Sequence, residues 1–599
     1  MAHESQGNRE RDPLRLLPSE LVLHILDFTS AQSLARLTSL NTSWHTFIDK
    51  THQDSIYSSP TKTCHPPGAK DFSWLRDSSS YSKWLKPEEV ASWKDLCRRQ
   101  TLLERNWNRE QPELRESIIQ VGDMPIWRFK PDFKRRLILS TSQGGAFKVT
   151  DMDSGNLLWS LESVRPFAHL EYQDGTAVWD REGNALEVWR TEEEGTGRGE
   201  FKQMAILPHE STTRGFQLSF DTLCVASSEG EGFVYESMTT GIPSLKTHIR
   251  GLEEGAVGHL DQCHDTVAYS LGPKGYHFFN KPSGRFLGVL NPRLCSHNFS
   301  HVLHPDVVYR GFSINQSSPS GPFNGLPGLT SPDRNAELHF RRGPQPLDDG
   351  RSGHTVPLKV VGGRLPLEDG EFMPLDEDEF DAGMFSRTSD LFVGVSRGGR
   401  VFICTDWRKA ILSTAEFNKQ TEILECDSDG STFDLGGWLS VKDHRIMFEI
   451  QDRMYVLGLT DDDRLDKTSS RPSFAFASSL SQKLAVPISF MAMYDDCIMA
   501  TYTTLRNRTR RLLARQPHRR LGVLPTKCIR VLSFAPFPVG RDGNGENGPD
   551  TITAPDGEGL DVSRITNEYM FELFERLADD DDDALTHMAV LGDLDNDVI

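Results

Sequence analysis

The stretch LILSTSQGGAFKVTDMDSG, residues 137–155, decides the fold of this chain of 599 residues. Two short apolar runs that flank a pair of glycines are typical of two strands joined by a tight turn. The same order of strand, turn, strand and closing Ser-Gly or Thr-Gly returns twice, with its final glycine at Gly241 and at Gly284. Gly284 follows Gly241 by 43 positions, and Gly241 follows Gly155 by twice that distance. A regular step of this length predicts four-stranded units, the blades of a β-propeller.

Further units extend the repeat over residues 113–536. One lies between the first two at 175–189, and later ones lie at 391–403, 438–457 and 498–532. We therefore predict a mainly β protein with about seven blades, and the pattern leaves six or eight open. Two packed β-sandwiches are the alternative, but they would not produce a regular step of 43 residues.

Two insertions interrupt the predicted propeller. Residues 313–390 are rich in Gly, Pro, Ser and Asp and are expected to form a long mobile loop. The second insertion is rich in arginine, and three interpretations of it stay open. It is a solvated hairpin loop, a nuclear-import address or partner for the chain's own acidic segments, or a patch that reads phosphate. Its arginines are Arg506, Arg508, Arg510, Arg511, Arg515, Arg519 and Arg520.

A small all-α module is predicted before the propeller, at residues 13–57, after a disordered arm at 1–12. Its first helix carries two apolar stripes, one with Leu21, Ile25 and Phe28 and the other with Val22 and Leu26. Three short helices cannot cover both stripes. One face is therefore expected to pack against the module's own core, and the other is available to a partner protein.

This module resembles an F-box. The resemblance rests on Leu-Pro-x-Glu-Leu at 17–21, on Ile-Leu-x-Phe at 25–28 and on the leucines and tryptophan that follow; the sequence departs from the family at Thr29, Ala31 and Leu40. F-boxes bind the Skp adaptor of the Skp–cullin–F-box ubiquitin ligase. The resemblance implies that the box and its adaptor face are built by Leu17, Pro18, Leu21, Ile25, Leu26, Leu34, Leu37, Leu40 and Trp44. Helical spacing does not say which of them form the core.

A second helical segment is predicted at 87–112, after an irregular connection at 58–86. Pro87 and two acids would open the helix, and one of its faces carries Trp93, Leu96, Leu103 and Trp107. The aromatic stripe predicts packing against a neighbouring domain. The string from Trp93 to Trp107 resembles the linker helix that joins F-boxes to WD-repeat propellers. The Gly-His and Trp-Asp pairs of ordinary WD repeats are mostly missing from the propeller itself.

The formal net charge of −20 is concentrated in two segments, an acidic cluster at 368–381 and the tail at 537–599. Both are expected to lie outside the folded parts. The tail should be largely disordered, with one amphipathic helix at about 563–578. An acidic chain is a poor nucleic-acid coat, because coating requires a basic face. No apolar run approaches the roughly 20 residues that span a bilayer, and the polar start predicts a cytoplasmic or nuclear protein.

No motif predicts catalysis, a cofactor or a metal site. The nine cysteines are scattered without metal-ligand spacing, which favours reduced thiols. Gly543–Gly548 fits G-x-G-x-x-G, but prolines on both sides argue against the strand and helix that a dinucleotide site needs. The acids at 579–583 lack the glycine and the closing glutamate of a calcium loop.

The sequence therefore predicts a non-catalytic substrate-recognition subunit of a Skp–cullin–F-box ubiquitin ligase. The box would bind the Skp adaptor and, through it, cullin, and the propeller would bind an unknown target protein and promote its ubiquitination. The arrangement resembles fungal-type F-box propeller proteins. The alternatives are a non-degradative interaction scaffold and, less favoured, a propeller hydrolase, which would need a polar, carboxylate-lined central pocket. No cofactor, nucleic acid or membrane is expected as a partner.

Overall fold

The computed structural model describes residues 12–535 with several gaps. The gaps are 67, 76–89, 91, 120, 122–124, 253–256, 296–299, 306–354, 363–375, 427–434, 451–452, 478–488 and 508–522. The chain divides into two compact units. Unit 1 comprises residues 1–113, 495–497 and 533–546, and unit 2 comprises 114–494, 498–532 and 547–599.

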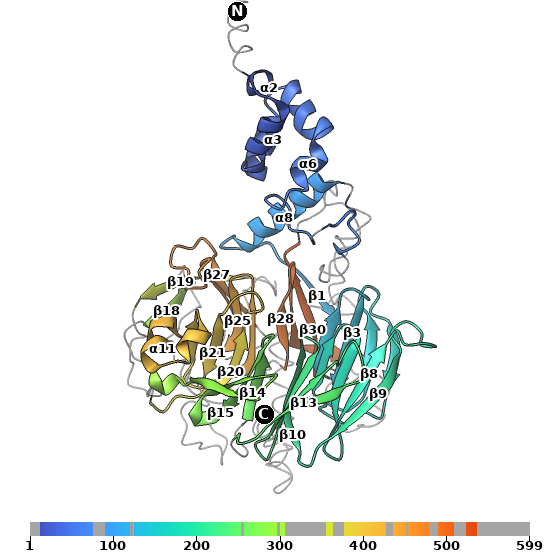
Figure 1. The fold of residues 1–599 in the computed structure, drawn as a ribbon. Coiled ribbons are helices and arrows are strands. Elements are labelled where there is room, and N and C mark those ends of the chain that lie inside the picture. The colour runs from blue at the N-terminus through green and yellow to red at the C-terminus, as the bar shows by residue number, and fades with distance from the viewer. Residues whose placement is uncertain are drawn as a thin grey trace, which may run out of the picture. The chain divides into compact units, whose positions relative to one another are not determined.

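Unit 1 is helical (Figure 1). Its helices are α2 (Pro13–Leu16), α3 (Ser19–Asp27), α4 (Ala31–Thr38), α5 (Thr42–His45), the π-helix η1 (Thr46–Thr51), α6 (Gln53–Tyr57) and α8 (Trp93–Trp107). Side-chain caps explain where several of them begin. Ser30 Oγ accepts from the Ser33 amide at the start of α4, and Asn41 Oδ1 accepts from the Trp44 amide at the start of α5.

The predicted linker helix is shorter than 87–112. It is α8, which begins at Trp93 because Ser92 has an extended backbone and its hydroxyl accepts from the Asp95 amide at 3.1 Å. It ends at Trp107. Pro87 and the two acids that were expected to open it lie outside the described residues.

Unit 2 is built mostly of antiparallel strands, and in the described residues five of its sheets have four strands each. Four of them follow the chain. The first two are β2 (Ile126–Asp132), β3 (Leu137–Ser142), β4 (Phe147–Asp151) and β5 (Leu157–Leu161), and then β6 (Leu170–Gln173), β7 (Thr176–Arg181), β8 (Ala185–Thr191) and β9 (Phe201–Pro208). The third contains β10 (Thr213–Ser219), β11 (Thr222–Ser227), β12 (Gly232–Glu236) and β13 (Ser244–Ile249). The fourth contains β14 (Val257–Gln262), β15 (Thr266–Leu271), β16 (Tyr276–Asn280) and β17 (Phe286–Leu290).

The fifth four-stranded sheet joins distant parts of the sequence. It has the order β1 (Arg115–Ile119), β30 (Val523–Ser533), β29 (Cys497–Asn507) and β28 (Met491–Met493). A strand from before the first repeat thus completes the sheet made by the last repeat. This arrangement closes a circular fold, because neither end of the repeat array is left as a free sheet.

The sixth sheet has ten strands. It contains two four-stranded meanders, β20 (Phe380–Phe385), β21 (Phe392–Ser396), β22 (Arg400–Cys404) and β23 (Thr421–Glu425), and β24 (Leu435–Lys442), β25 (Arg445–Ile450), β26 (Arg453–Gly458) and β27 (Ser473–Ala477). The hairpin β18 (Ser300–Pro305) and β19 (Val356–Gly362) lies between them. β18 runs parallel to β23, and β19 runs antiparallel to β27.

The prediction of one mobile loop over 313–390 is therefore wrong in part, because β19 and β20 lie inside that range. β20 is a core strand in which Phe380 and Phe385 are buried, so burial of apolar surface outweighs the cost of ordering it. The acidic cluster is also partly folded. Asp378 is fully buried and pairs with Arg400 at 2.7 Å, which compensates the buried charge.

The first strands of successive units contact one another in chain order, from β2 through β6, β10, β14, β20 and β24 to β28. The circle closes where Phe490, directly before β28, meets Phe129 of β2 with ring centroids 4.8 Å apart. Aromatic side chains also fill the space between neighbouring sheets, as where Phe147 stacks on Trp179. Unit 2 is thus a mostly β region of four-stranded units, consistent with a propeller. A blade number of about seven stays a prediction.

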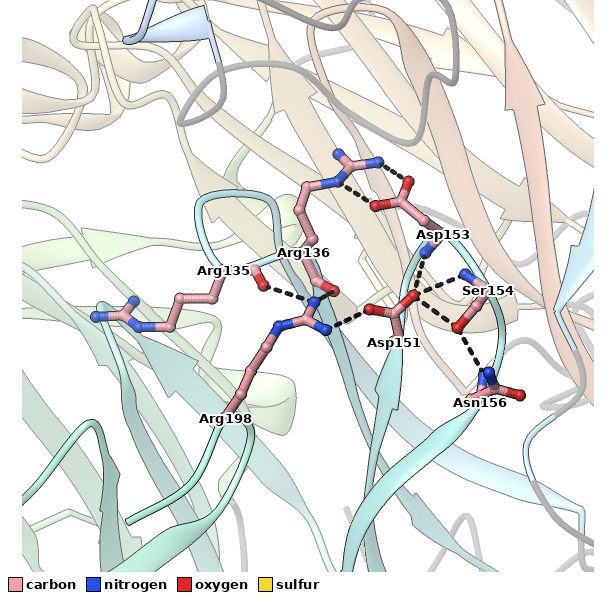
Figure 2. A network of polar contacts seen from close by, with 7 residues as sticks. All are labelled: Arg135, Arg136, Asp151, Asp153, Ser154, Asn156 and Arg198. Atoms are coloured by element: carbon pink, nitrogen blue, oxygen red, sulfur yellow. Dashed lines mark hydrogen bonds and ion pairs between the residues drawn. The ribbon is translucent and has the colours of Figure 1, made fainter. Parts of the chain in front are cut away.

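The repeated Ser-Gly marks the turn after the third strand of a unit. Asp151 Oδ1 accepts from the Asp153 and Ser154 amides and from Ser154 Oγ, at 3.1, 2.7 and 2.8 Å (Figure 2). Gly155 then takes a φ of 72°, which glycine adopts without strain. Asn280, Ser283 and Gly284 repeat this turn in the sheet of β14–β17. The Ser-Gly pairs at Gly155 and Gly284 thus reflect the same local hydrogen-bonded turn.

The first of these turns, at Asp151, is also part of a salt-bridge network (Figure 2). Arg198 pairs with Asp151 Oδ2 at 2.6 Å and donates to the backbone carbonyls of Arg135 and Arg136. Arg136 in turn pairs with Asp153 at 2.7 Å. The loop before β9 is thereby fixed to the β2–β3 and β4–β5 turns of the neighbouring sheet.

Candidate partner-binding face of the helical unit

The core of the helical unit is formed by one side of each short helix. Val22 and Leu26 of α3, Leu34 of α4, Trp44 of α5 and Ile48 of η1 are buried in one cluster. Leu17 and Leu37 are half-buried against it. Of the predicted box residues, Leu26, Leu34 and Trp44 therefore belong to the core. Their role is to hold the helices together.

The second stripe of α3 is exposed. Leu21, Ile25 and Phe28 are spaced four and three residues apart, so they share one helical face, and all three are solvent-exposed. Phe28 is 77% exposed, and the His24 ring lies against it edge to face. Leu16 and Leu40 are exposed as well, and Pro18 caps α3 at the surface. We call Leu16, Leu21, Ile25, Phe28 and Leu40 the apolar face.

Such a surface is costly in water unless a partner covers it. The sequence predicted three members of the apolar face, namely Leu21, Ile25 and Leu40, within the box. Leu16 and Phe28 were not among the predicted site residues. The helical spacing from Leu21 could have indicated Phe28, since its stripe was already apparent.

The C-terminal end of α3 is held by the segment that follows α6. Ser59 Oγ donates a hydrogen bond to Asp27 Oδ1, and Thr61 Oγ1 donates to the same oxygen at 3.0 Å. Lys62 Nζ donates to the Asp27 carbonyl. The hydrogen bonds from Ser59 and Thr61 lower the pKa of the Asp27 carboxyl below its usual value. Asp27 is therefore ionised at neutral pH.

The predicted packing residues of α8 lie in unit 1, where two sets of contacts hold the helix. Near its start, Trp93 is half-buried against the core that Cys97 helps to form, and Lys94 pairs with the buried Asp49 at 2.6 Å. Leu96 is buried in a second small cluster, and Leu103 is half-buried.

At the end of α8, Trp107 stacks on Phe534 with ring centroids 3.5 Å apart. Its indole Nε1 donates to the Asp495 carbonyl at 3.1 Å. The Asn106 amide donates to the carbonyls of Glu113 and Phe534, at 2.8 and 2.9 Å. Residues 495–497 and 533–535 thus belong to the helical unit through contacts with this one turn of helix.

A buried carboxylate lies on the first strand of the second sheet of unit 2. Glu171 pairs with Lys130 of β2 at 2.9 Å and with His169 Nε2 at 3.3 Å. Burial by itself raises the pKa of Glu171, but the positive charge of Lys130 and the hydrogen bond from His169 outweigh it and bring the pKa to about 2. Glu171 is therefore ionised at neutral pH. A carboxylate with this low pKa is poorly suited to act as a proton donor near neutral pH.

Several predicted features lie wholly or partly outside the described residues. Arg506 lies in β29, but its side chain is not described, and the other six arginines of the insertion lie outside the described residues. The same is true of the tail helix at 563–578. Among the residues that the structure describes, no helix is long and apolar enough to cross a membrane, and no cluster of three potential metal ligands occurs. No disulfide joins any of the nine cysteines, all of which lie within the described residues.

Comparison with protein families identifies the helical unit. The F-box domain model matches residues 14–53, which contain most of the buried core and all five residues of the apolar face. F-box proteins are generally non-catalytic adaptors, and F-box domains bind the Skp adaptor. A search of curated proteins found no match.

Three solved structures show partial similarity. They are the computationally designed Ika8 protein (13% identity, 64% of this chain, 95% of that chain, TM-score 0.36), the designed Ika4 protein (16%, 27%, 94%, 0.23) and a chain of the Mitotic Checkpoint Complex (9%, 59%, 76%, 0.29). The family match is specific to the N-terminal unit. This chain therefore contains an F-box domain at residues 14–53, followed by a mostly β, propeller-like region.

Proposed function

We propose that this chain is the substrate-recognition subunit of a Skp–cullin–F-box ubiquitin ligase. The observation that carries the proposal is the apolar face on an F-box domain whose own core is already complete. Because Val22, Leu26 and Leu34 fill the core, Leu21, Ile25 and Phe28 are not needed for it. The Skp adaptor is the partner that would cover them.

Unit 2 would bind the target protein. In this role it presents many turns and edge strands on a closed β scaffold, an arrangement that suits protein recognition. The arginine insertion between β29 and β30 is a candidate patch for a phosphorylated or acidic target. We propose that the chain acts in the cytoplasm or the nucleus.

The contribution to the reaction would be proximity. A target held by unit 2 and an adaptor held by the F-box domain place a target lysine near the ubiquitin-charged enzyme at high effective concentration. This chain would supply no bond-making group.

The test is adaptor binding by a variant that alters only exposed residues. In the full chain, the joint change Leu21→Ser and Ile25→Ser should abolish co-purification with the purified Skp adaptor. Leu157→Ser is the matched control, because Leu157 is an equally exposed leucine on β5 of the other unit. Undiminished binding by the double variant would overturn the proposal.

Two further measurements separate a ligase subunit from a scaffold. A ligase subunit should co-purify with cullin through the adaptor, and loss of the apolar face should lengthen the half-life of the bound target. Adaptor binding with an unchanged target half-life would favour the non-degradative scaffold.

A further inference from the structure

Residues Ser59–Thr63, which we call the strap, connect the end of α6 to the end of α3. Besides the three side-chain contacts with Asp27, Thr61 Oγ1 donates to the Asp27 carbonyl at 2.9 Å. The strap is also folded on itself, since the amides of Lys62 and Thr63 both donate to the Ser59 carbonyl, at 2.8 and 3.0 Å. Ser59 therefore anchors the strap both through its backbone and through its side chain.

The strap has the chemistry of a kinase substrate. Its sequence is Ser59-Pro60-Thr61-Lys62, with proline directly after the serine and a basic residue three positions after it. Proline-directed protein kinases select serine in this pattern. Pro60 and Thr61 are exposed, and Ser59 is partly exposed. Two other Ser-Pro pairs occur in the chain, at Ser318 and Ser331, and both lie outside the described residues.

We propose that Ser59 is a phosphorylation site, and that its modification releases the strap from α3. A proline-directed kinase would transfer the terminal phosphoryl group of a nucleoside triphosphate to Ser59 Oγ. The new bond is Oγ–P, the bond to the leaving nucleoside diphosphate breaks, and the hydroxyl proton passes to the kinase's base.

The release follows from what the hydroxyl does now. Ser59 Oγ–H is a donor to the ionised Asp27 carboxylate. Phosphorylation removes that donor and places a group of charge about −1.5 to −2 against the carboxylate. Lys62 Nζ donates to the Asp27 carbonyl and to Thr61 Oγ1, so at most one of its three N–H groups is left for the phosphate. The attractive contact thus becomes a repulsive one, and the strap must move away.

The consequence for the adaptor rests on the proposed function above. Asp27 is the last residue of α3, and the most exposed member of the apolar face, Phe28, follows it directly. Release of the strap would free this end of the helix to fray. Adaptor affinity should then fall about tenfold, because the apolar face is no longer held in one conformation.

The experiment uses the full chain with Ser318→Ala and Ser331→Ala, so that Ser59 is the one Ser-Pro site left. A cyclin-dependent kinase with ATP should add one phosphate, located at Ser59 by peptide mapping. Pro60→Ala should prevent the modification, since it removes the feature the kinase reads and leaves the hydrogen bonds in place. Failure to phosphorylate Ser59 would overturn the proposal.

Hydrogen exchange then measures the release without the adaptor. The amides of Lys62 and Thr63 should exchange about tenfold faster or more after phosphorylation. In a chain that also carries Asp27→Asn, the same phosphate should change their exchange much less, because the opposing charge is gone. Unchanged exchange in the phosphorylated protein would refute the proposal, as would an equal effect with and without Asp27.

Adaptor titration completes the test. Binding that weakens about tenfold on phosphorylation supports a switch, whereas unchanged affinity contradicts its effect on the adaptor. If the unmodified chain does not bind the adaptor at all, the proposed function fails. The exchange measurement still decides whether phosphorylation releases the strap.

Discussion

Leu21 and Val22 are adjacent in α3 but lie in opposite environments, since Leu21 is 51% exposed and Val22 is 2% exposed. Leu21 belongs to the apolar face and Val22 to the core. The same contrast separates Ile25 from Leu26. The buried core and the exposed apolar face therefore use different residues of one helix, and substitutions can separate their effects.

We expect Leu26→Ala to lower the free energy of unfolding of the F-box domain by about 2–5 kcal/mol, because it leaves a cavity in the core. Leu21→Ala should change it by no more than about 0.5 kcal/mol, because its side chain already contacts water. Hydrogen exchange of the α3 and α4 amides in the full chain measures both. Equal destabilisation by the two variants would contradict the assignment.

The stack of Trp107 on Phe534 predicts a second large effect. Trp107→Ala removes a buried indole, and we expect it to cost about 3–5 kcal/mol of local stability. Trp107→Phe keeps an aromatic ring but loses the donor to the Asp495 carbonyl, and should cost about 1 kcal/mol for the lost hydrogen bond. Exchange of the amides of residues 105–107 and 533–535 is the measurement.

Arg105→Ala is the matched control, since Arg105 lies on the exposed side of the same helical turn. It should leave the exchange rates almost unchanged. If Arg105→Ala and Trp107→Ala accelerated exchange to the same extent, the effect could not be attributed to loss of the stack.

The sequence predicted the architecture well because its evidence is local. Apolar spacing located the stripes of α3, and the Ser-Gly turn after the third strand located the repeat through residues such as Asp151 and Gly155. The helix cap at Ser92 was missed. Acids and a proline before it suggested an earlier start, but the extended backbone of Ser92 fixes the start of α8 at Trp93.

Contacts between distant residues could not be predicted. The composition of 313–390 indicated a mobile loop, because Gly, Pro and acids dominate it. Yet Asp378 forms a buried ion pair with Arg400, and β19 pairs with β27, which is distant in the sequence. The strap was likewise predicted as irregular. The sequence around Ser59 does not indicate that its hydroxyl donates a hydrogen bond to Asp27.

Glu171 predicts an acid-sensitive unit 2. Its pKa falls from about 4.5 to about 2 on folding, because Lys130 and His169 outweigh the effect of burial. The ionised form thus stabilises the fold above pH 4.5, and this contribution is lost as the pH falls toward 2. The melting temperature of unit 2 should therefore drop between pH 5 and pH 3.

Glu171→Gln should lower the melting temperature at pH 7 and flatten its dependence below pH 4.5. Burial lowers the pKa of His169. Titration of His169 should therefore change the melting temperature at a higher pH than titration of Glu171 does, and both proteins should show this second change. Parallel curves for the two proteins below pH 4.5 would show that the carboxylate of Glu171 does not control the acid response.

Because the same turn occurs with an asparagine, the negative charge of Asp151 can be tested separately from its role as a hydrogen-bond acceptor. Asp151→Ala removes the acceptor for two amides and a hydroxyl, and we expect a loss of about 1–3 kcal/mol in unit 2. Asp151→Asn keeps an acceptor oxygen, and Asn280 shows that an asparagine forms the same turn with Ser283. The asparagine variant should therefore lose mainly the ion pair with Arg198.

In an Arg198→Ala background, Asp151→Asn should then have almost no further effect on thermal unfolding, whereas Asp151→Ala should still destabilise. If Asp151→Asn were as damaging as Asp151→Ala in both backgrounds, the turn would depend on the carboxylate itself and not on its acceptor geometry.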